Sequence, residues 1–287
     1  GFPSLNVTQV MEKRSSSSKI FNTTEFFQDN KFRTVEVSLS GTLHKDSGHI
    51  DLLENAMYSS ADPLAIGYDW TGASGKYGTS TVSNGTFSLV LESPDQTDGY
   101  NIVLSGCMVT NFAITADMGT DGGAYKWSAT ISSGKVPALD NTATLSTTAF
   151  SGSPISLATA ATKKVYSIDP IMSSFGLTID SPAVYAGVVS TGHENFGHGA
   201  ELSVTAEAVL KLDSLTRDLP DDFDTQSSHD AVDSFTITQS TASDFSISMP
   251  SAYLTDVSYN EGDIMMLNVG LKAVGIGSGS ILTIDVA

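Results

Sequence analysis

The stretch ELSVTAEAVLKLD, from Glu201 to Asp213, alternates apolar and polar residues over most of its length. Successive side chains of a β-strand point to opposite faces of a sheet, so a period of two is typical of a strand with one buried face. The stretch TVEVSLSGTLH, from Thr34 to His44, repeats the pattern. Both predict long strands, and together they indicate an all-β protein.

A second pair of alternating stretches, YKWSATI from Tyr125 and MMLNVGLKA from Met265, follows the same pattern. Each comes after a glycine-containing turn, TDGG at 120–123 and NEGD at 260–263, as expected for hairpins. A further strand is expected before each turn, beginning at Tyr100 and at Phe245. The order of strand, hairpin and strand therefore occurs twice.

This repeat predicts two tandem domains, at 1–150 and 151–287, with a Ser/Thr/Ala-rich connection at about 141–164. A short helix is expected after the first long strand of each half. In SGHIDLLENAM, from Ser47, the apolar residues have helical spacing, whereas Pro220 shortens the counterpart SLTRDLPDDFD. Ser15–Ser18 is expected to be a flexible loop, and GIGSGS a turn before a last strand, ILTIDVA.

The composition argues against a nucleic-acid-binding protein. Acidic residues outnumber basic ones 32 to 14, giving a formal charge of −18, without the clustered cations that neutralise phosphates. Cys107 is the single cysteine, so no internal disulfide forms, and we expect it to be a buried apolar residue. The sequence shows no signal peptide and no apolar run long enough for a membrane helix, so we expect neither secretion by that route nor membrane association.

Candidate metal and catalytic motifs are weak. His193, Glu194 and His198 lie close together in TGHENFGHG, but the two histidines are five apart rather than the four of a helical zinc motif. Two acidic runs could offer oxygen ligands to calcium but lack the ligand spacing of a calcium loop. These runs are Asp117, Thr120 and Asp121, and Asp218, Asp221, Asp222 and Asp224. We therefore expect loop tips and turns at these positions, and predict no enzyme, no cofactor and no metal.

Aromatic residues raise the alternative of a carbohydrate-binding module, because β-sandwiches often bind sugars through exposed rings. Trp127 lies on the apolar face of its predicted strand, which favours a role in the core. Trp70 lies in the glycine-rich stretch IGYDWTGASGKYG, and its position cannot be assigned from the pattern.

Two segments, SLSGTLHKDSGHIDLLENAM and LSGCMVTNFAITADMGTDGGAYKWSATISSG, resemble the major tail tube proteins of long-tailed, siphovirus-like bacterial viruses. Shared features are a long strand followed by a short helix, a Gly-Cys strand, a DGG turn and a returning strand. They span about Val37 to Gly134, and DFSISMPSAYLTDVSYNEGDIMMLNVGLKAV resembles the closing hairpin again. The second half departs from the family pattern because it lacks the Gly-Cys pair and the DGG turn.

The resemblance implies tandem β-sandwich tube domains, each with a flanking helix, whose long hairpins join those of neighbouring subunits in a β-barrel. Six such domains normally form a ring, so a duplicated chain implies a trimeric, pseudo-hexameric ring, with a ring of six chains as the alternative. About 24 strands, ~4.8 Å apart and tilted ~40°, enclose a circle of roughly 48 Å, or on the order of 35–40 Å inside the side chains. That width admits duplex DNA.

The resemblance also implies a location in the virion tail after assembly in the host cytoplasm. DNA would pass without specific binding, and the implied partners are tape-measure, tail-terminator and tail-tip proteins. The predicted lumen-facing residues are the polar ones of the two long strands: Glu36, Ser38, Ser40, Thr42, Glu201, Ser203, Thr205 and Glu207. The alternatives are a capsid-decorating or fibre-like β-sandwich protein and, less favoured, a carbohydrate-binding module or hydrolase.

Overall fold

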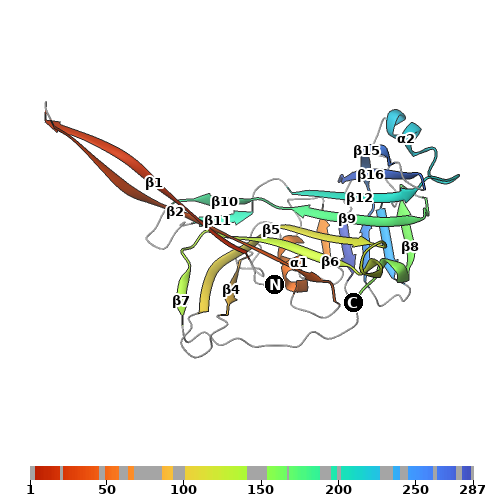
Figure 1. The fold of residues 1–287 in the computed structure, drawn as a ribbon, viewed down its shortest axis with the longest axis horizontal. Coiled ribbons are helices and arrows are strands. Elements are labelled where there is room, and N and C mark those ends of the chain that lie inside the picture. Colours follow the sequence, from red (N-terminus) through yellow and green to blue (C-terminus); the bar gives the residue numbers. More distant parts are fainter. Residues whose placement is uncertain are drawn as a thin grey trace.

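The protein is predominantly antiparallel β-structure with two α-helices in the described residues of a computed structural model (Figure 1). The structure describes residues 4–19, 22–44, 49–57, 64–67, 86–92, 101–140, 154–166, 168–187, 195–198, 202–226, 235–239, 245–260, 264–275 and 280–285. The all-β class predicted from the alternating stretches is confirmed.

A long sheet organises the molecule. Its strands follow the order β1-β2-β6-β5-β9-β12-β16-β15, and two short strands, β4 (Phe87–Leu91) and β7 (Ala138–Asp140), also pair with β5. Every pairing is antiparallel. The strands of this path are β1 (Ser4–Lys19), β2 (Asn22–Thr42), β5 (Asn101–Asp117), β6 (Lys126–Ser133), β9 (Met172–Asp180), β12 (Ser203–Lys211), β15 (Ala252–Asn260) and β16 (Met266–Ala273).

The order of strands in this sheet repeats. The series β1-β2-β6-β5 is followed by β9-β12-β16-β15, and β5 pairs with β9 where the two series meet. In each series the second strand is followed in the chain by an α-helix, α1 (His49–Met57) or α2 (Leu219–Thr225). The division of the chain into domains at residue 150 stays a prediction.

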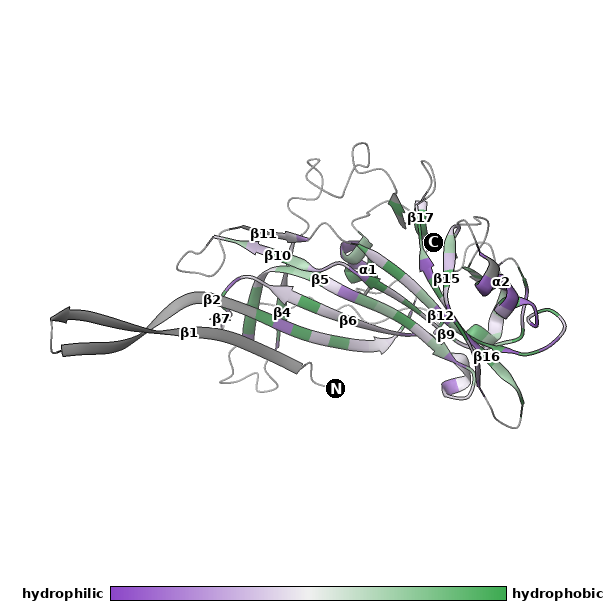
Figure 2. Ribbon diagram, turned by 90° about the horizontal axis from the view of Figure 1, so that it is seen from above, coloured by the Kyte–Doolittle hydropathy of each residue, from purple (hydrophilic) through white to green (hydrophobic). Residues whose placement is uncertain are grey.

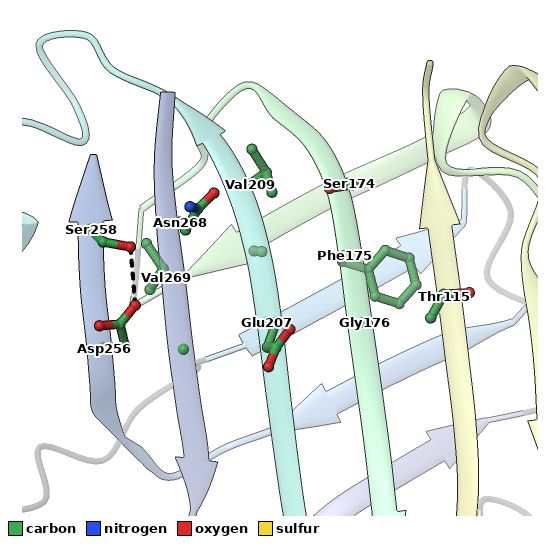
Figure 3. A pocket seen from close by; sticks show the side chains of 12 residues that line it. Thr115, Ser174, Phe175, Gly176, Glu207, Val209, Asp256, Ser258, Asn268 and Val269 are labelled. Atoms are coloured by element: carbon green, nitrogen blue, oxygen red, sulfur yellow. Dashed lines mark hydrogen bonds between the residues drawn. The ribbon is translucent and has the colours of Figure 1, made fainter. Parts of the chain in front are cut away.

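A second sheet of five strands packs against the long one. Its order is β3-β17-β14-β13-β8, with strands β3 (Leu64–Gly67), β8 (Ala160–Val165), β13 (Phe235–Gln239), β14 (Ser246–Met249) and β17 (Ser280–Asp285). These strands cross behind those of the long sheet (Figure 3). A separate hairpin joins β10 (Ala183–Ala186) and β11 (Asn195–His198). Because β3 pairs with β17, the second sheet combines strands from both predicted halves.

Alternation of apolar and polar residues places one face of each strand in the core, and Figure 2 shows the resulting bands along β5 and β6. Tyr125 lies at the centre of the core, with its ring edge-on to Phe175 and Phe245 at centroid distances of 5.2 and 5.8 Å. Its hydroxyl accepts a hydrogen bond from Gln239 Nε2 at 2.9 Å. A first-half residue is thus anchored to both sheets, which ties the predicted halves together.

Two expectations about loops are wrong. Ser15–Ser18 lies within β1, because β2 supplies backbone partners at Thr23, Thr24 and Glu25. The supposed connection at 141–164 includes most of β8 and a turn of 3₁₀-helix at Leu157–Thr159. The predicted short helices α1 and α2 and the strand after GIGSGS are confirmed. Trp70 and most of the NEGD turn fall outside the described residues.

Candidate functional site

One face of the long sheet carries polar side chains across most of its width. Residues directly opposite each other on paired strands share a face, so the registers identify rows of neighbours across the sheet. One such row, from β2 to β16, consists of Ser40, Ser128, Ala113, Thr178, Thr205 and Lys272. The predicted polar residues of β2 and β12 therefore lie on one continuous surface, which we call the polar face.

The structure places seven of the predicted lumen-facing residues on the polar face. Glu36, Ser38, Ser40 and Glu207 are exposed. The remaining three described residues, Thr42, Ser203 and Thr205, are half-buried between neighbouring strands, whereas Glu201 lies outside the described residues. Register places the β2 and β12 groups on one surface although three strands, β6, β5 and β9, lie between them.

Glu207 stands in a shallow hollow of the polar face with a volume of about 430 Å³ (Figure 3). Gly176 on β9 and Gly270 on β16 lie directly opposite it on either side, so no flanking side chain covers its carboxylate from those positions. At the side of the hollow, Ser258 Oγ donates a hydrogen bond to Asp256 Oδ2 at 3.1 Å. The two glycines therefore create a carboxylate-lined hollow that the sequence alternation alone does not indicate.

The polar face has more acidic than basic residues among its described positions. The acidic side chains are Glu36, Asp117, Asp180, Glu207 and Asp256, and the basic ones are Lys126, Lys211 and Lys272. Lys126 is ion-paired with Asp121 of the β5–β6 turn. Most positions between these charges carry hydroxyl or amide side chains, with Ala113, Gly176, Val209 and Gly270 as apolar exceptions. Such a surface offers little attraction to a polyanion.

Most of the exposed large apolar side chains gather at one rim of the long sheet, where β5, β12 and β15 end and β9 and β16 begin. We call this set the apolar rim: Met118, Ile171, Leu215, Tyr259, Ile264 and Met265. β1 and β2 continue as a paired arm, from about Met11 to Asp29, that leaves the sheet at the opposite rim (Figure 1). Strand alternation could not reveal the rim, because these residues lie at strand ends or in turns.

The acidic runs considered as calcium sites are engaged in local structure. Asp117 accepts hydrogen bonds from Gly119 N–H at 2.8 Å and from the Thr120 hydroxyl at 2.9 Å, and these bonds hold its pKa below the ordinary value. Asp218 pairs with Arg217 at 3.3 Å at the start of α2. Within the part of the chain that the structure describes, no three His, Cys, Asp or Glu side chains are placed to share a metal ion.

The structure describes only part of the TGHENFGHG motif. His193 and Glu194 lie outside the described residues, whereas His198 belongs to β11 and is 8% exposed. Its Nδ1 is 2.7 Å from Ser181 Oγ, and burial lowers the pKa of the imidazole to about 3. His198 is therefore a neutral packing residue at ordinary pH. Burial likewise raises the pKa of the Cys107 thiol to about 11, in keeping with its expected core role.

Of the two tryptophans, only Trp127 is described. It lies on the core side of β6, parallel to Phe112 with ring centroids 6.0 Å apart.

Neither described helix has the length and apolar character needed to cross a membrane. Comparison with known proteins finds no family model and no curated protein that matches this sequence.

Proposed function

We propose that the chain is a structural virion protein whose copies close laterally into rings, which stack into the hollow tail tube through which viral DNA passes. The observation that carries this proposal is the long sheet, with its repeated order of four strands, its continuous polar face and two outer strands. Among the described residues, β1 and β15 each pair with only one strand of this sheet. An edge strand that offers unpaired backbone groups is suited to accept a strand from another copy.

The strand count supports a ring of three chains. Each copy supplies a path of eight strands, β1 to β15, so three copies supply about 24 strands. At ~4.8 Å spacing and ~40° tilt, such a barrel has a backbone diameter of roughly 48 Å. The polar face would then line the lumen, with Glu36 and Glu207 beside the DNA path and the core face turned toward the second sheet.

Stacking of the rings would use the two ends of the molecule. The arm leaves one rim of the long sheet and the apolar rim lies at the other, so head-to-tail contact brings unlike surfaces together. Tape-measure, terminator and tip proteins would meet the same two ends in the virion. No catalytic step is assigned to the chain.

Electron microscopy of the purified protein tests the proposal. We expect hollow rings or tubes whose projections show three chains and six similar lobes per ring. A monodisperse monomer that binds glycans would contradict the proposal and favour the carbohydrate-binding alternative. Solid particles or capsid-bound protein without tubes would favour the decorating or fibre-like alternative. Rings of six chains would refute the stoichiometry but keep the tube.

A further inference from the structure

The strands β5 and β15 hold the same place in the two series of the long sheet and share a bulge. The register of β5 with β6 shifts between Val109 and Asn111, and that of β15 with β16 shifts between Leu254 and Asp256. The sequences around these shifts, VTNFAI from Val109 and LTDVSY from Leu254, align residue by residue without gaps. Val109 therefore corresponds to Leu254, and Asn111 to Asp256.

A side-chain amide closes the backbone edge at both corresponding residues. Asn55 Oδ1 of α1 accepts a hydrogen bond from Val109 N–H at 2.8 Å. Directly after α2, Gln226 accepts from Leu254 N–H at 3.0 Å and donates to Leu254 O at 2.7 Å. The Gln226 amide thus pairs with Leu254 as a neighbouring strand would.

Alternation of the β15–β16 hydrogen bonds supports this view of the edge. Val274 N–H donates a hydrogen bond to Ser251 O, so these two residues form a hydrogen-bonded pair across β15 and β16. Hydrogen-bonded and non-hydrogen-bonded pairs alternate along an antiparallel ladder. Leu254 and Leu271, three positions further along, therefore form a non-hydrogen-bonded pair. The N–H and C=O groups of Leu254 consequently point away from β16. Gln226 closes the outer edge of the sheet at that residue.

On the C-terminal side of Val109, the outer edge of β5 pairs with β9. Asn111 lies opposite Asp180 and donates to its carboxylate at 2.5 Å, and Ser181 N–H donates to the carbonyl of the bulge residue Thr110 at 2.9 Å. The corresponding edge of β15, Asp256–Asn260, carries no strand within the described residues. Tyr259 on this edge is 57% exposed, although its counterpart Ile114 is fully buried.

β1 holds the place in the first series that β9 holds in the second. The registers show which residues of these two strands correspond. Ser38 and Glu207 hold matching places, because they lie opposite Thr130 and Gly270, the partners of Asn111 and Asp256. The matching residues of β1 and β9 are Ser4 with Gly176, Asn6 with Thr178 and Thr8 with Asp180. Gly176, Thr178 and Asp180 face Thr115, Ala113 and Asn111 on β5.

We propose that β15 of one copy pairs antiparallel with β1 of the next copy in the register of the internal β5–β9 pairing, with Gln226 as the stop that fixes this register. Asp256 then lies opposite Thr8, Ser258 opposite Asn6 and Asn260 opposite Ser4. This inference rests on the proposed lateral closure of rings and names the strands and residues that make it.

The faces of the two strands agree in this register. Val257 and Tyr259 come opposite Val7 and Leu5, whose partners on β2, Val35 and Val37, are fully buried. A slip by one residue would place each apolar position opposite a polar one. A slip toward the start of β15 would bring the incoming strand onto Leu254, where Gln226 already occupies the edge.

Disulfide cross-linking of the full-length chain tests the register. Cysteines introduced at Ser258 and Asn6 should form disulfides between copies under mild oxidation, and denaturing electrophoresis should show a ladder that ends at three chains. Cys107 is buried and does not compete. The matched control pairs Ser258→Cys with Ser4→Cys, which reports a register shifted by two residues toward the start of β15, and it should cross-link at least about tenfold more slowly. Equal rates, or no cross-linked species, would overturn the proposed register.

The role of Gln226 is tested in the same double-cysteine chains. Gln226→Ala should raise the control cross-link toward the rate of the matched pair and speed amide exchange of Leu254 roughly tenfold, since one bonded edge position is released. Asp224→Ala, an exposed change at the end of α2, should alter neither. Unchanged control cross-linking in Gln226→Ala would refute the stop. Selective cross-links without hollow rings in the microscope would refute the tube and keep the strand junction.

Discussion

His198 is a buried imidazole whose neutrality makes folding depend on pH. The unfolded chain binds a proton with a pKa near 6.5 and the folded chain only at about 3, so stability falls as pH drops through this window. The expected loss from this group is about 1.4 kcal/mol for each pH unit below about 6.5. Chemical denaturation between pH 7 and 4 measures it.

The variant His198→Gln isolates this contribution from that of the carboxylates. It should be less stable than the natural chain at pH 7 because the contact with Ser181 is altered, yet its stability should decline less steeply on acidification. Parallel declines in both proteins would show that His198 does not govern this part of the acid response.

Cys107 gives a second expectation for a single side chain. The thiol is fully buried with Sγ 3.4 Å from Leu104 O, and its pKa of about 11 leaves little thiolate at pH 8. A thiol-specific chromogenic reagent should react with less than about a tenth of the protein in the native state within minutes. In denaturant the same sample should react fully, and rapid native labelling would contradict the burial.

At the scale of the strand, Gly270 and Gly176 both flank Glu207, but the same change to alanine should affect stability differently at the two positions. A Cβ on Gly270 would lie 2.7 Å from Thr255 Oγ1 in the β15 bulge, whereas one on Gly176 meets nothing closer than 3.8 Å. We expect Gly270→Ala to cost about 1–3 kcal/mol of unfolding free energy. Gly176→Ala should be neutral or stabilising by up to roughly 1 kcal/mol, because it lowers the entropy of the unfolded strand.

Thermal or urea unfolding of the two variants makes the comparison. Adding Thr255→Ala to Gly270→Ala removes the hydroxyl that causes the clash and should recover most of the lost stability. If the second change gives no recovery, the clash is not the source of the loss.

Strands with one buried face were the part of the fold that sequence reasoning predicted best. The alternation around Val35, Val37, Val204 and Ala206 matches residues that are buried in the structure, and it also identifies their polar neighbours. The helical spacing of Leu53 and Met57 was equally informative, because both side chains face the core. Local periodicity predicted these elements because burial on one side is a local property of a strand or helix.

Features that depend on pairing between distant segments were missed. The β9 sequence MSSFGLTID alternates only from Phe175 onward, and its place beside β5 has no local signature. Gln226 follows a short helix and resembles any exposed polar residue until its two bonds to Leu254 are seen. The hollow around Glu207 likewise arises from glycines on two other strands, which no period along β12 can reveal.

At the scale of the whole molecule, the proposed tube function predicts how charge on the polar face should influence genome delivery. Replacing both Glu36 and Glu207 with lysine should leave tubes intact, because both side chains are exposed on that face. Passage of DNA should slow, since the four-unit change in charge on each chain would attract phosphate where the natural surface repels it. Infectivity and the rate of DNA release from particles carrying the variant measure the effect.

A glutamine pair provides the matched control, with Glu36→Gln and Glu207→Gln changing the charge by half as much. Its effect on DNA release should be smaller than that of the lysine pair and should weaken at high salt. Normal infectivity of the lysine variant would show that the polar face does not line the channel.

The pairing of β3 with β17 sets the timing of folding during synthesis. The ribosome makes Leu64–Gly67 before its partner strand, Ser280–Asp285, which lies far downstream in the chain. Ile66 and Leu282 are both buried in the sheet that forms when the two strands meet. Nascent chains on one messenger are crowded together, yet each lacks its finished second sheet until that moment. Under the proposed ring assembly, the order of synthesis therefore separates completion of each copy from its joining to other copies.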